Sequence, residues 1–203
     1  MKSKRLGSEI IRLALPATIE NIFQTLVGFF DTLLIAQLGL VAVTAVGLAN
    51  TILNVYLAVF LAIGVGGTAL IARSLGAGQK EKARQYARQT QELSIAGGIV
   101  FGFISIFFGR LMLQAMGASG SALEDAQVFF YWVGGFSLLH ASMTSLGTIL
   151  RATGDTVTPM KVGIITNVTN VLLDYFLIFG FGSWDGLGIL GTALGTIFAR
   201  LLG

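Results

Sequence analysis

The stretch "NVTNVLLDYFLIFG", residues 167–180, combines a long apolar run with three polar side chains that are costly in lipid. Asn167, Asn170 and Asp174 stand at positions i, i+3 and i+7, so one face of a helix carries all three. A charged carboxylate at the centre of a bilayer costs at least about 2.5–3.5 kcal/mol. In a membrane, this stretch therefore predicts a spanning helix whose polar stripe faces protein or a water-filled cavity.

The composition of the whole chain indicates an integral membrane protein. Of its 203 residues, 54% are hydrophobic and 11% are charged, whereas soluble domains carry about 25% charged residues. The basic residues lie in short connectors and form no basic face with interleaved aromatic side chains, which argues against nucleic-acid binding. The chain has no cysteine, so it contains neither disulfides nor thiolate metal sites.

Six stretches are long and apolar enough to span a bilayer core, which needs about 20 helical residues. We predict an all-α bundle of six transmembrane helices that forms one unit over residues 1–203. The expected spans are 13–35, 45–72, 93–115, 127–150, 161–181 and 187–203.

The connectors predict the orientation of the bundle. Basic residues precede the first span, lie between the second and third spans, and lie between the fourth and fifth, whereas the alternate connectors contain no Lys or Arg. By the positive-inside rule, the N-terminus is cytoplasmic in a multi-pass protein of the inner (plasma) membrane. The basic residues of the connector after the second span are expected either to be solvated or to contact anionic lipid headgroups.

Four polar side chains are expected to meet in the outer half of the membrane. A rise of ~1.5 Å per residue places Asp31 ~27 Å above the start of the first span and Asp174 ~20 Å above the start of the fifth. Asn170 lies one turn before Asp174, and Thr192 lies close to the outer start of the sixth span. Carboxylate, amide and hydroxyl oxygens suit Na⁺ or H⁺. The alternative is that these side chains form structural hydrogen bonds between helices.

Other polar groups within the spans either line a cavity or make packing contacts. They are Glu20, Gln24, Asn50, Asn54, Asn167 and Thr196. Pro16 is either a proline tolerated near a helix start or a kink that lets the upper part of the first helix move.

Four segments together resemble the multidrug and toxic compound extrusion (MATE) transporters. They are "LALPATIENIFQTLVGFFDTLLIAQLG", "GVGGTALIARSLGAGQKEKAR", "LRATGDTVTPMK" and "NVTNVLLDYFLIFG…GLGILGTALGT". The resemblance covers nearly the whole chain in order. Within the family, the sequence is similar to the prokaryotic branch that includes DNA-damage-inducible proteins.

The resemblance implies two six-helix lobes that export organic, often cationic, compounds in exchange for Na⁺ or H⁺, with no other cofactor. It also implies a cation site in the N-terminal lobe, at positions that read Asp31, Asn170, Asp174 and Thr192 here. The family's proline in the first helix matches Pro16, which favours the kink. The chain is therefore expected to be the N-terminal lobe of a twelve-helix transporter, truncated within the sixth span, or a half-transporter that pairs with a second copy of itself.

Two other classes of protein fit the intramembrane carboxylates less well. An intramembrane aspartyl protease also needs two facing carboxylates, but such enzymes carry a Gly-x-Gly-Asp element, whereas "VLL" precedes Asp174. A structural or lipid-handling subunit, such as a flippase-like protein, would favour a strongly basic cavity, whereas these spans offer acids and amides.

Overall fold

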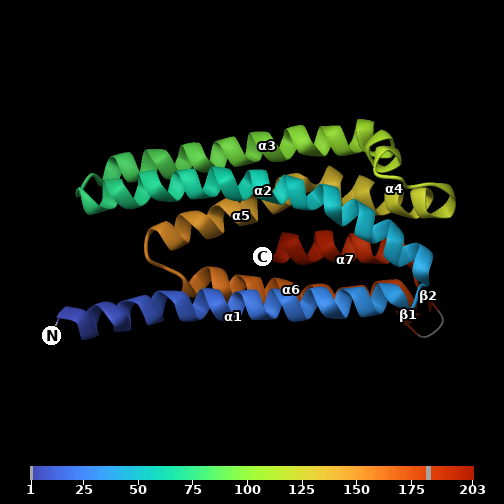
Figure 1. Cartoon of the computed structure of the whole chain (residues 1–203), viewed down its shortest axis with the longest axis horizontal. Coiled ribbons are helices and arrows are strands. Elements are labelled where there is room, and N and C mark those ends of the chain that lie inside the picture. Colours follow the sequence, from blue (N-terminus) through green and yellow to red (C-terminus); the bar gives the residue numbers. More distant parts are fainter. Residues whose placement is uncertain (1, 182–183) are drawn as a thin grey trace.

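A computed structural model describes residues 2–181 and 184–203 as a bundle of long helices (Figure 1). The small hairpin between the last two helices pairs Gly180 with Asp185 and Phe181 with Trp184. The elements in chain order are α1 (Lys2–Ala36), α2 (Leu40–Gly76), α3 (Lys80–Ala115), α4 (Gly120–Gly135), α5 (Ser137–Ala152), α6 (Val157–Phe179), β1 (Gly180–Phe181), β2 (Trp184–Asp185) and α7 (Ile189–Leu202).

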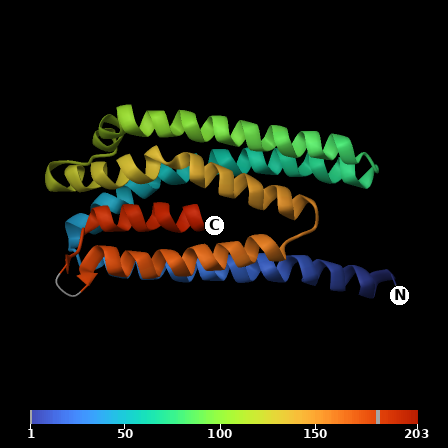
Figure 2. The same cartoon turned by 180° about the vertical axis from the view of Figure 1, so that it is seen from behind.

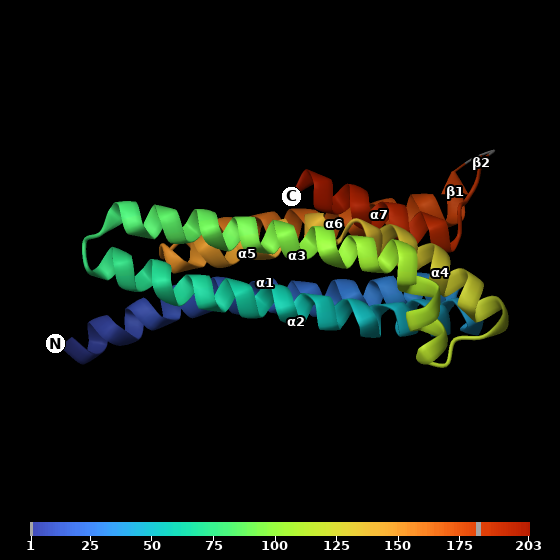
Figure 3. The same ribbon diagram turned by 90° about the horizontal axis from the view of Figure 1, so that it is seen from above.

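The helices form two packed groups. Helices α2, α3, α4 and α5 pack on one another, while α6 lies between α1 and α7. The two groups are joined by contacts between α4 and α7. Figure 2, seen from the opposite side, shows α7 between the α4–α5 pair and α6. Seen from above, the α2–α3 hairpin and the N-terminal part of α1 extend toward the same end of the molecule (Figure 3). We call this the N-terminal end of the bundle.

The bundle confirms the predicted all-helical membrane fold. Within the described part of the chain, four helices are long and apolar enough to cross a membrane: residues 14–36 of α1, together with α2, α3 and α6. The pair α4 and α5 makes a fifth if it is counted as one broken span, and α7 is a shorter apolar helix. Helices α2 and α3 extend well past the expected spans, because the charged connector between them is itself helical.

The expected continuous span 127–150 is wrong in one respect, because it breaks at Phe136 with a bend of 48° between α4 and α5. Glycines and serines weaken a helix at such a point, and the break follows Gly134 and Gly135. Here Ser137 donates a hydrogen bond to the carbonyl of Gly98 on α3, at 2.9 Å. A side chain at Gly102 would lie 2.6 Å from the carbonyl oxygen of Gly135, so this glycine allows the broken segment to approach α3 closely.

An aromatic core holds α2, α3 and α4 together. The ring of Tyr56 stacks on Phe101 at 4.2 Å between centroids, and Phe60 meets Phe101 edge-on at 5.6 Å. Phe60 and Phe130 are among the most buried large side chains. The hydroxyl of Tyr56 shares a hydrogen bond with Ser105 at 3.1 Å, so the polar end of this ring is also satisfied. This core fixes α2, α3 and α4 relative to one another, and α5 and α7 pack against them.

Pro16 lies inside α1, which runs without interruption from Lys2 to Ala36. The expectation of a proline near a helix start is therefore wrong, since the helix begins 14 residues earlier. Proline removes one hydrogen bond from the interior of a helix and weakens it there. The kink remains a prediction about how α1 moves.

Candidate functional site

Asp174 is the most deeply buried carboxylate among the described residues, with 1% of its surface exposed. It projects from α6 toward α7, where its Oδ1 lies directly against Gly195. Any side chain at this glycine would occupy the position of the carboxylate oxygen. Gly191, one turn earlier, likewise lies against the carbonyl of Leu177. The sequence Gly-x-x-x-Gly on α7 therefore creates the space into which Asp174 fits.

Polar atoms without a hydrogen-bond partner gather on α1, α6 and α7. Six buried side-chain atoms of the described residues lack one, and four of them belong to the predicted cation site. These four are Oδ1 of Asp31, Nδ2 of Asn170, Oδ1 of Asp174 and Oγ1 of Thr192. Buried polar groups are usually hydrogen-bonded, and leaving one unsatisfied costs about 1–3 kcal/mol. Such a group of atoms is typical of a site whose ligand supplies the missing contacts.

The two aspartates interact across the interface between α1 and α6. The carboxyl of Asp31 is close enough to exert a Coulombic effect on that of Asp174. Two carboxylates that repel each other in a buried place favour either a shared proton or a bound cation. No cluster of three or more His, Cys, Asp or Glu side chains occurs in the described part of the chain. The donor set is therefore two carboxylates with neutral amide and hydroxyl groups, which suits a hard monovalent cation or a proton.

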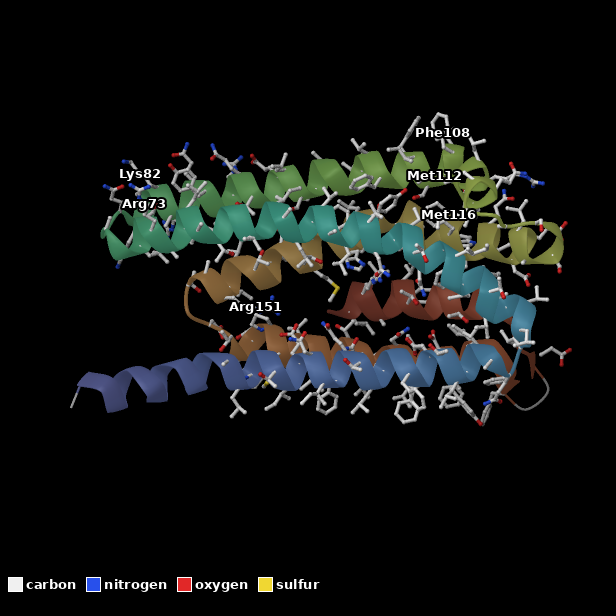
Figure 4. The ribbon with its side chains drawn as sticks, in the orientation of Figure 1. Arg73, Lys82, Phe108, Met112, Met116 and Arg151 are labelled. Atoms are coloured by element: carbon white, nitrogen blue, oxygen red, sulfur yellow. The ribbon has the colours of Figure 1, made fainter. Side chains whose placement is uncertain are left out.

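Glu20 lies on the same face of α1 as Asp31, eleven residues earlier, and it has a partner. Arg151, at the end of α5, donates from one Nη to both carboxylate oxygens of Glu20 at 2.7 Å (Figure 4). The side chain of Glu20 is 11% exposed and that of Arg151 is 33% exposed. A Cβ added at Gly163 on α6 would lie 3.5 Å from the side chain of Glu20. Glu20 is therefore held between α5 and α6, and the two roles expected from the sequence, cavity lining and packing contact, both stay predictions.

The remaining predicted cavity residues lie around the site in different settings. Asn167 on α6 is half-buried, and Thr196 donates its hydroxyl to the carbonyl of Thr192 at 2.9 Å. Gln24 on α1, and Asn50 and Asn54 on α2, are exposed on the surface of the chain. The structure does not bring these three exposed amides together with the aspartates.

Sequence reasoning missed Arg151 as the partner of Glu20 and Thr166 as an extension of the polar stripe. Thr166 is buried on α6, and its hydroxyl also lacks a partner among the described residues. The sequence contains a signal for Thr166, since Thr166, Asn170 and Asp174 follow a spacing of four. It contains none for Arg151, which pairs with Glu20 across 131 positions.

Comparison with known proteins identifies the family. The MatE family model matches residues 16–176, which is most of the chain. The chain belongs to the MatE family. The MatE match includes α1 from Pro16, the broken pair α4–α5 and the polar stripe of α6. Members of this family are membrane transporters and not enzymes, which sets aside the protease interpretation.

Individual relatives from the MatE family cover nearly all of the chain. It is 33% identical to the "Probable multidrug resistance protein NorM" of Thermotoga maritima over 98% of this chain and 43% of that protein. It is 28% identical to the "DNA damage-inducible protein F" of Escherichia coli over 93% of this chain and 40% of that one. A solved MOP superfamily transporter from Pyrococcus furiosus superposes with a TM-score of 0.89 at 27% identity. That match covers 96% of this chain and 42% of that structure.

The chain thus spans less than half the length of the relatives that it matches. This proportion agrees with one lobe of a two-lobed transporter, as the resemblance implied.

Proposed function

We propose that the chain is the N-terminal lobe of a cation-coupled multidrug efflux antiporter and that it carries the site for the coupling cation, Na⁺ or H⁺. Asp31 and Asp174 supply the charge, while Asn170 and Thr192 supply neutral ligands. One observation carries this proposal: three buried oxygens on three neighbouring helices, those of Asp31, Asp174 and Thr192, lack hydrogen-bond partners among the described residues. A structural cluster of helix contacts would instead satisfy its own donors and acceptors.

Binding of the cation changes the electrostatic balance between α1 and α6. Without it, two carboxylates share a buried interface and repel each other. A Na⁺ ion or a proton removes this repulsion and allows α1 to pack more tightly on α6. Since α1 carries Pro16 below Asp31, its upper part is the segment that changes position. Cation occupancy thereby biases the balance between two states of the lobe, which is the requirement for coupled exchange.

The substrates are expected to be small organic compounds, often cationic, that occupy the cavity when the coupling cation leaves. Competition for one acidic cavity is sufficient to exchange the two. Simultaneous binding is not required, because each ligand favours the opposite state.

The test is efflux of a fluorescent organic cation from proteoliposomes that contain the native full-length protein. A Na⁺ gradient and a pH gradient are imposed in separate experiments, so the same assay identifies the coupling cation. Asp174→Asn is expected to abolish efflux under whichever gradient drives the wild-type protein. Asp185→Asn serves as the matched control, because Asp185 is an exposed carboxylate in the β1–β2 hairpin. Full coupled efflux by Asp174→Asn would overturn the proposal.

The partner of this lobe is either a C-terminal lobe of the same polypeptide or a second copy of the chain. The exposed amides support such a partner, because Gln24, Asn50 and Asn54 are costly to leave in contact with lipid. The mass of the native product in mild detergent separates the two cases. A polypeptide about twice this length indicates a fused lobe, a dimer of this chain indicates self-pairing, and a monomer of this length would contradict both.

A further inference from the structure

We propose that the ion pair between Glu20 and Arg151 is a gate that closes the N-terminal end of the cation route to Asp31 and Asp174. The inference rests on the proposed function, because it assigns a route to the cation site. In this arrangement the cation reaches the aspartates from that end of the bundle when Glu20 and Arg151 separate.

The first support is the register between two parallel helices. Glu20 lies against Gly163, and Asp31 interacts with Asp174. The two contacts are separated by eleven residues on α1 and by eleven residues on α6, so the two helices keep the same register between them. Eleven residues correspond to three turns and about 16 Å. The ion pair and the aspartates are therefore two points along one interface.

The second support is the polar stripe of α6 that connects these two points. Thr166, Asn170 and Asp174 are spaced by four residues, and each has a buried polar atom without a partner among the described residues. Asp174 lies against Gly195 on α7, and Thr166 lies against Gly203, the residue that follows α7. A cation that moves along α6 therefore meets a hydroxyl, an amide and a carboxylate on successive turns, and the oxygens of these three groups are the atoms that can bind it. An apolar helix face would offer no such series.

The third support is the position of Arg151. It ends α5, and its guanidinium crosses to α1 to reach Glu20 (Figure 4). Another Nη of Arg151 lies 3.3 Å from the place of a side chain at Gly147, and Glu20 lies over Gly163. Glycines on α5 and α6 therefore make room for the pair. When it is formed, the pair occupies the space between three helices, and the guanidinium bonds both carboxylate oxygens of Glu20, so this carboxylate cannot bind an incoming cation.

A purely structural clamp would hold the helices without controlling access, so the test measures access. This chain contains no cysteine, and Thr166→Cys places one thiol between the pair and the aspartates. In the native full-length protein, any cysteine elsewhere is first replaced by serine. Membrane vesicles are then treated with a charged, membrane-impermeant methanethiosulfonate reagent, and the rate of labelling is measured. Lys82→Cys, an exposed position on the α2–α3 hairpin, identifies the side of the membrane on which the N-terminal end lies.

Labelling of T166C from this side is expected to be slow with the ion pair intact. Adding Arg151→Gln should accelerate it about tenfold or more, because loss of the pair shifts the gate toward its open state. Glu20→Gln, which is nearly isosteric, should have the same effect and provides a second test if the first variant folds poorly. The exchanged pair Glu20→Arg with Arg151→Glu should return labelling to the slow rate.

The matched control removes an ion pair that does not face the stripe. Arg88 bonds Glu92 at 2.7 Å on the exposed surface of α3, and Arg88→Gln should leave labelling of T166C unchanged. The gate is overturned if labelling stays slow in folded Arg151→Gln and Glu20→Gln, or if Arg88→Gln accelerates it equally. Because labelling requires neither cation binding nor transport, it can succeed where Asp174→Asn shows no defect. Failure of the gate and failure of the cation site are therefore distinguishable.

Discussion

The interface between α1 and α6 buries acidic side chains at two places, and the chain supplies a charged partner at only one of them. At one, Glu20 is bonded by Arg151 from α5. At the other, Asp31 and Asp174 are close enough for their charges to interact, and each has a carboxylate oxygen without a partner in the described structure. The first place is complete by itself, whereas the second needs something that the chain does not supply.

This difference separates a paired charge from an unpaired one. A buried ion pair is costly to break, because removal of one partner leaves the other charge uncompensated. A buried carboxylate without a partner is already uncompensated, so binding of a cation or a proton to it stabilises the folded protein. Burial alone would not distinguish Glu20 from Asp174, but the presence of a partner does.

The largest expected effect on stability follows from breaking the ion pair between Glu20 and Arg151. Arg151→Gln leaves Glu20 buried without its partner, and it should lower the free energy of unfolding by roughly 2–4 kcal/mol, the lower part of this range reflecting the partial exposure of Arg151. Replacement of both residues by methionine should cost much less, because an apolar pair of similar volume needs no compensation. Thermal unfolding midpoints in detergent measure both variants. Equal losses in the single and double variants would contradict the assignment of a buried pair.

The second effect concerns the space for Asp174. Gly195→Ala puts a methyl group against the carboxylate oxygen, and we expect overpacking of about 1–3 kcal/mol. Loss of cation-dependent stabilisation should accompany it. Gly28→Ala is the control, since nothing lies within 4 Å of the added Cβ on α1. That variant should be neutral or more stable by about 0.4–1 kcal/mol. A neutral Gly195→Ala would show that α7 does not pack so closely on Asp174.

The comparison predicts opposite signs for two similar substitutions. Asp174→Asn removes an unsatisfied charge, and in a buffer without Na⁺ it should raise the free energy of unfolding by about 1 kcal/mol. Glu20→Gln removes a satisfied charge and should lower it by about 1 kcal/mol or more. Chemical unfolding of both variants in the same detergent gives the sign directly. Destabilisation by Asp174→Asn under these conditions would mean that its carboxylate has a structural partner.

The smallest effect involves a third, solvent-facing carboxylate. Asp155 accepts hydrogen bonds from the backbone N–H groups of Val157 and Thr158 at the start of α6, and also from the Thr158 hydroxyl at 2.6 Å. The Thr158 hydroxyl and backbone hold the pKa of Asp155 below its ordinary value of 3.8. Its contribution to stability is therefore complete above pH 3.8 and is lost as the pH falls through the lowered pKa.

Asp155→Ala should consequently lower the unfolding midpoint slightly at pH 7. The difference from the wild-type protein should shrink as the pH falls below 3.8, where the wild-type carboxyl also loses its charge. Asp185→Ala is the control, because Asp185 is an exposed carboxylate in the hairpin rather than at the start of a helix. A difference that stays constant with pH would show that the charge of Asp155 does not matter.

Much of the fold could be predicted from sequence, because apolar runs and basic connectors are local signals. The limits of the fifth and sixth spans differ from those of α6 and α7 by at most four residues, whereas α1 begins 11 residues before the first expected span. The break at Phe136 was not predicted, because glycines also occur inside continuous helices such as α2. What breaks the helix is contact with α3, through Gly98 and Gly102, and this contact is made between distant parts of the chain.

Within the candidate site, the sequence by itself determined which residues are polar and how they are spaced along each helix. Helical periodicity placed Asn170 and Asp174 on one face, and the cost of charge in lipid turned that face inward. Tertiary structure alone decided which carboxylate has a partner. Arg151 reaches Glu20 across 131 positions of sequence, whereas no cation from the described chain bonds Asp31 or Asp174. Pairing depends on which helices pack together, and that is a property of the whole bundle.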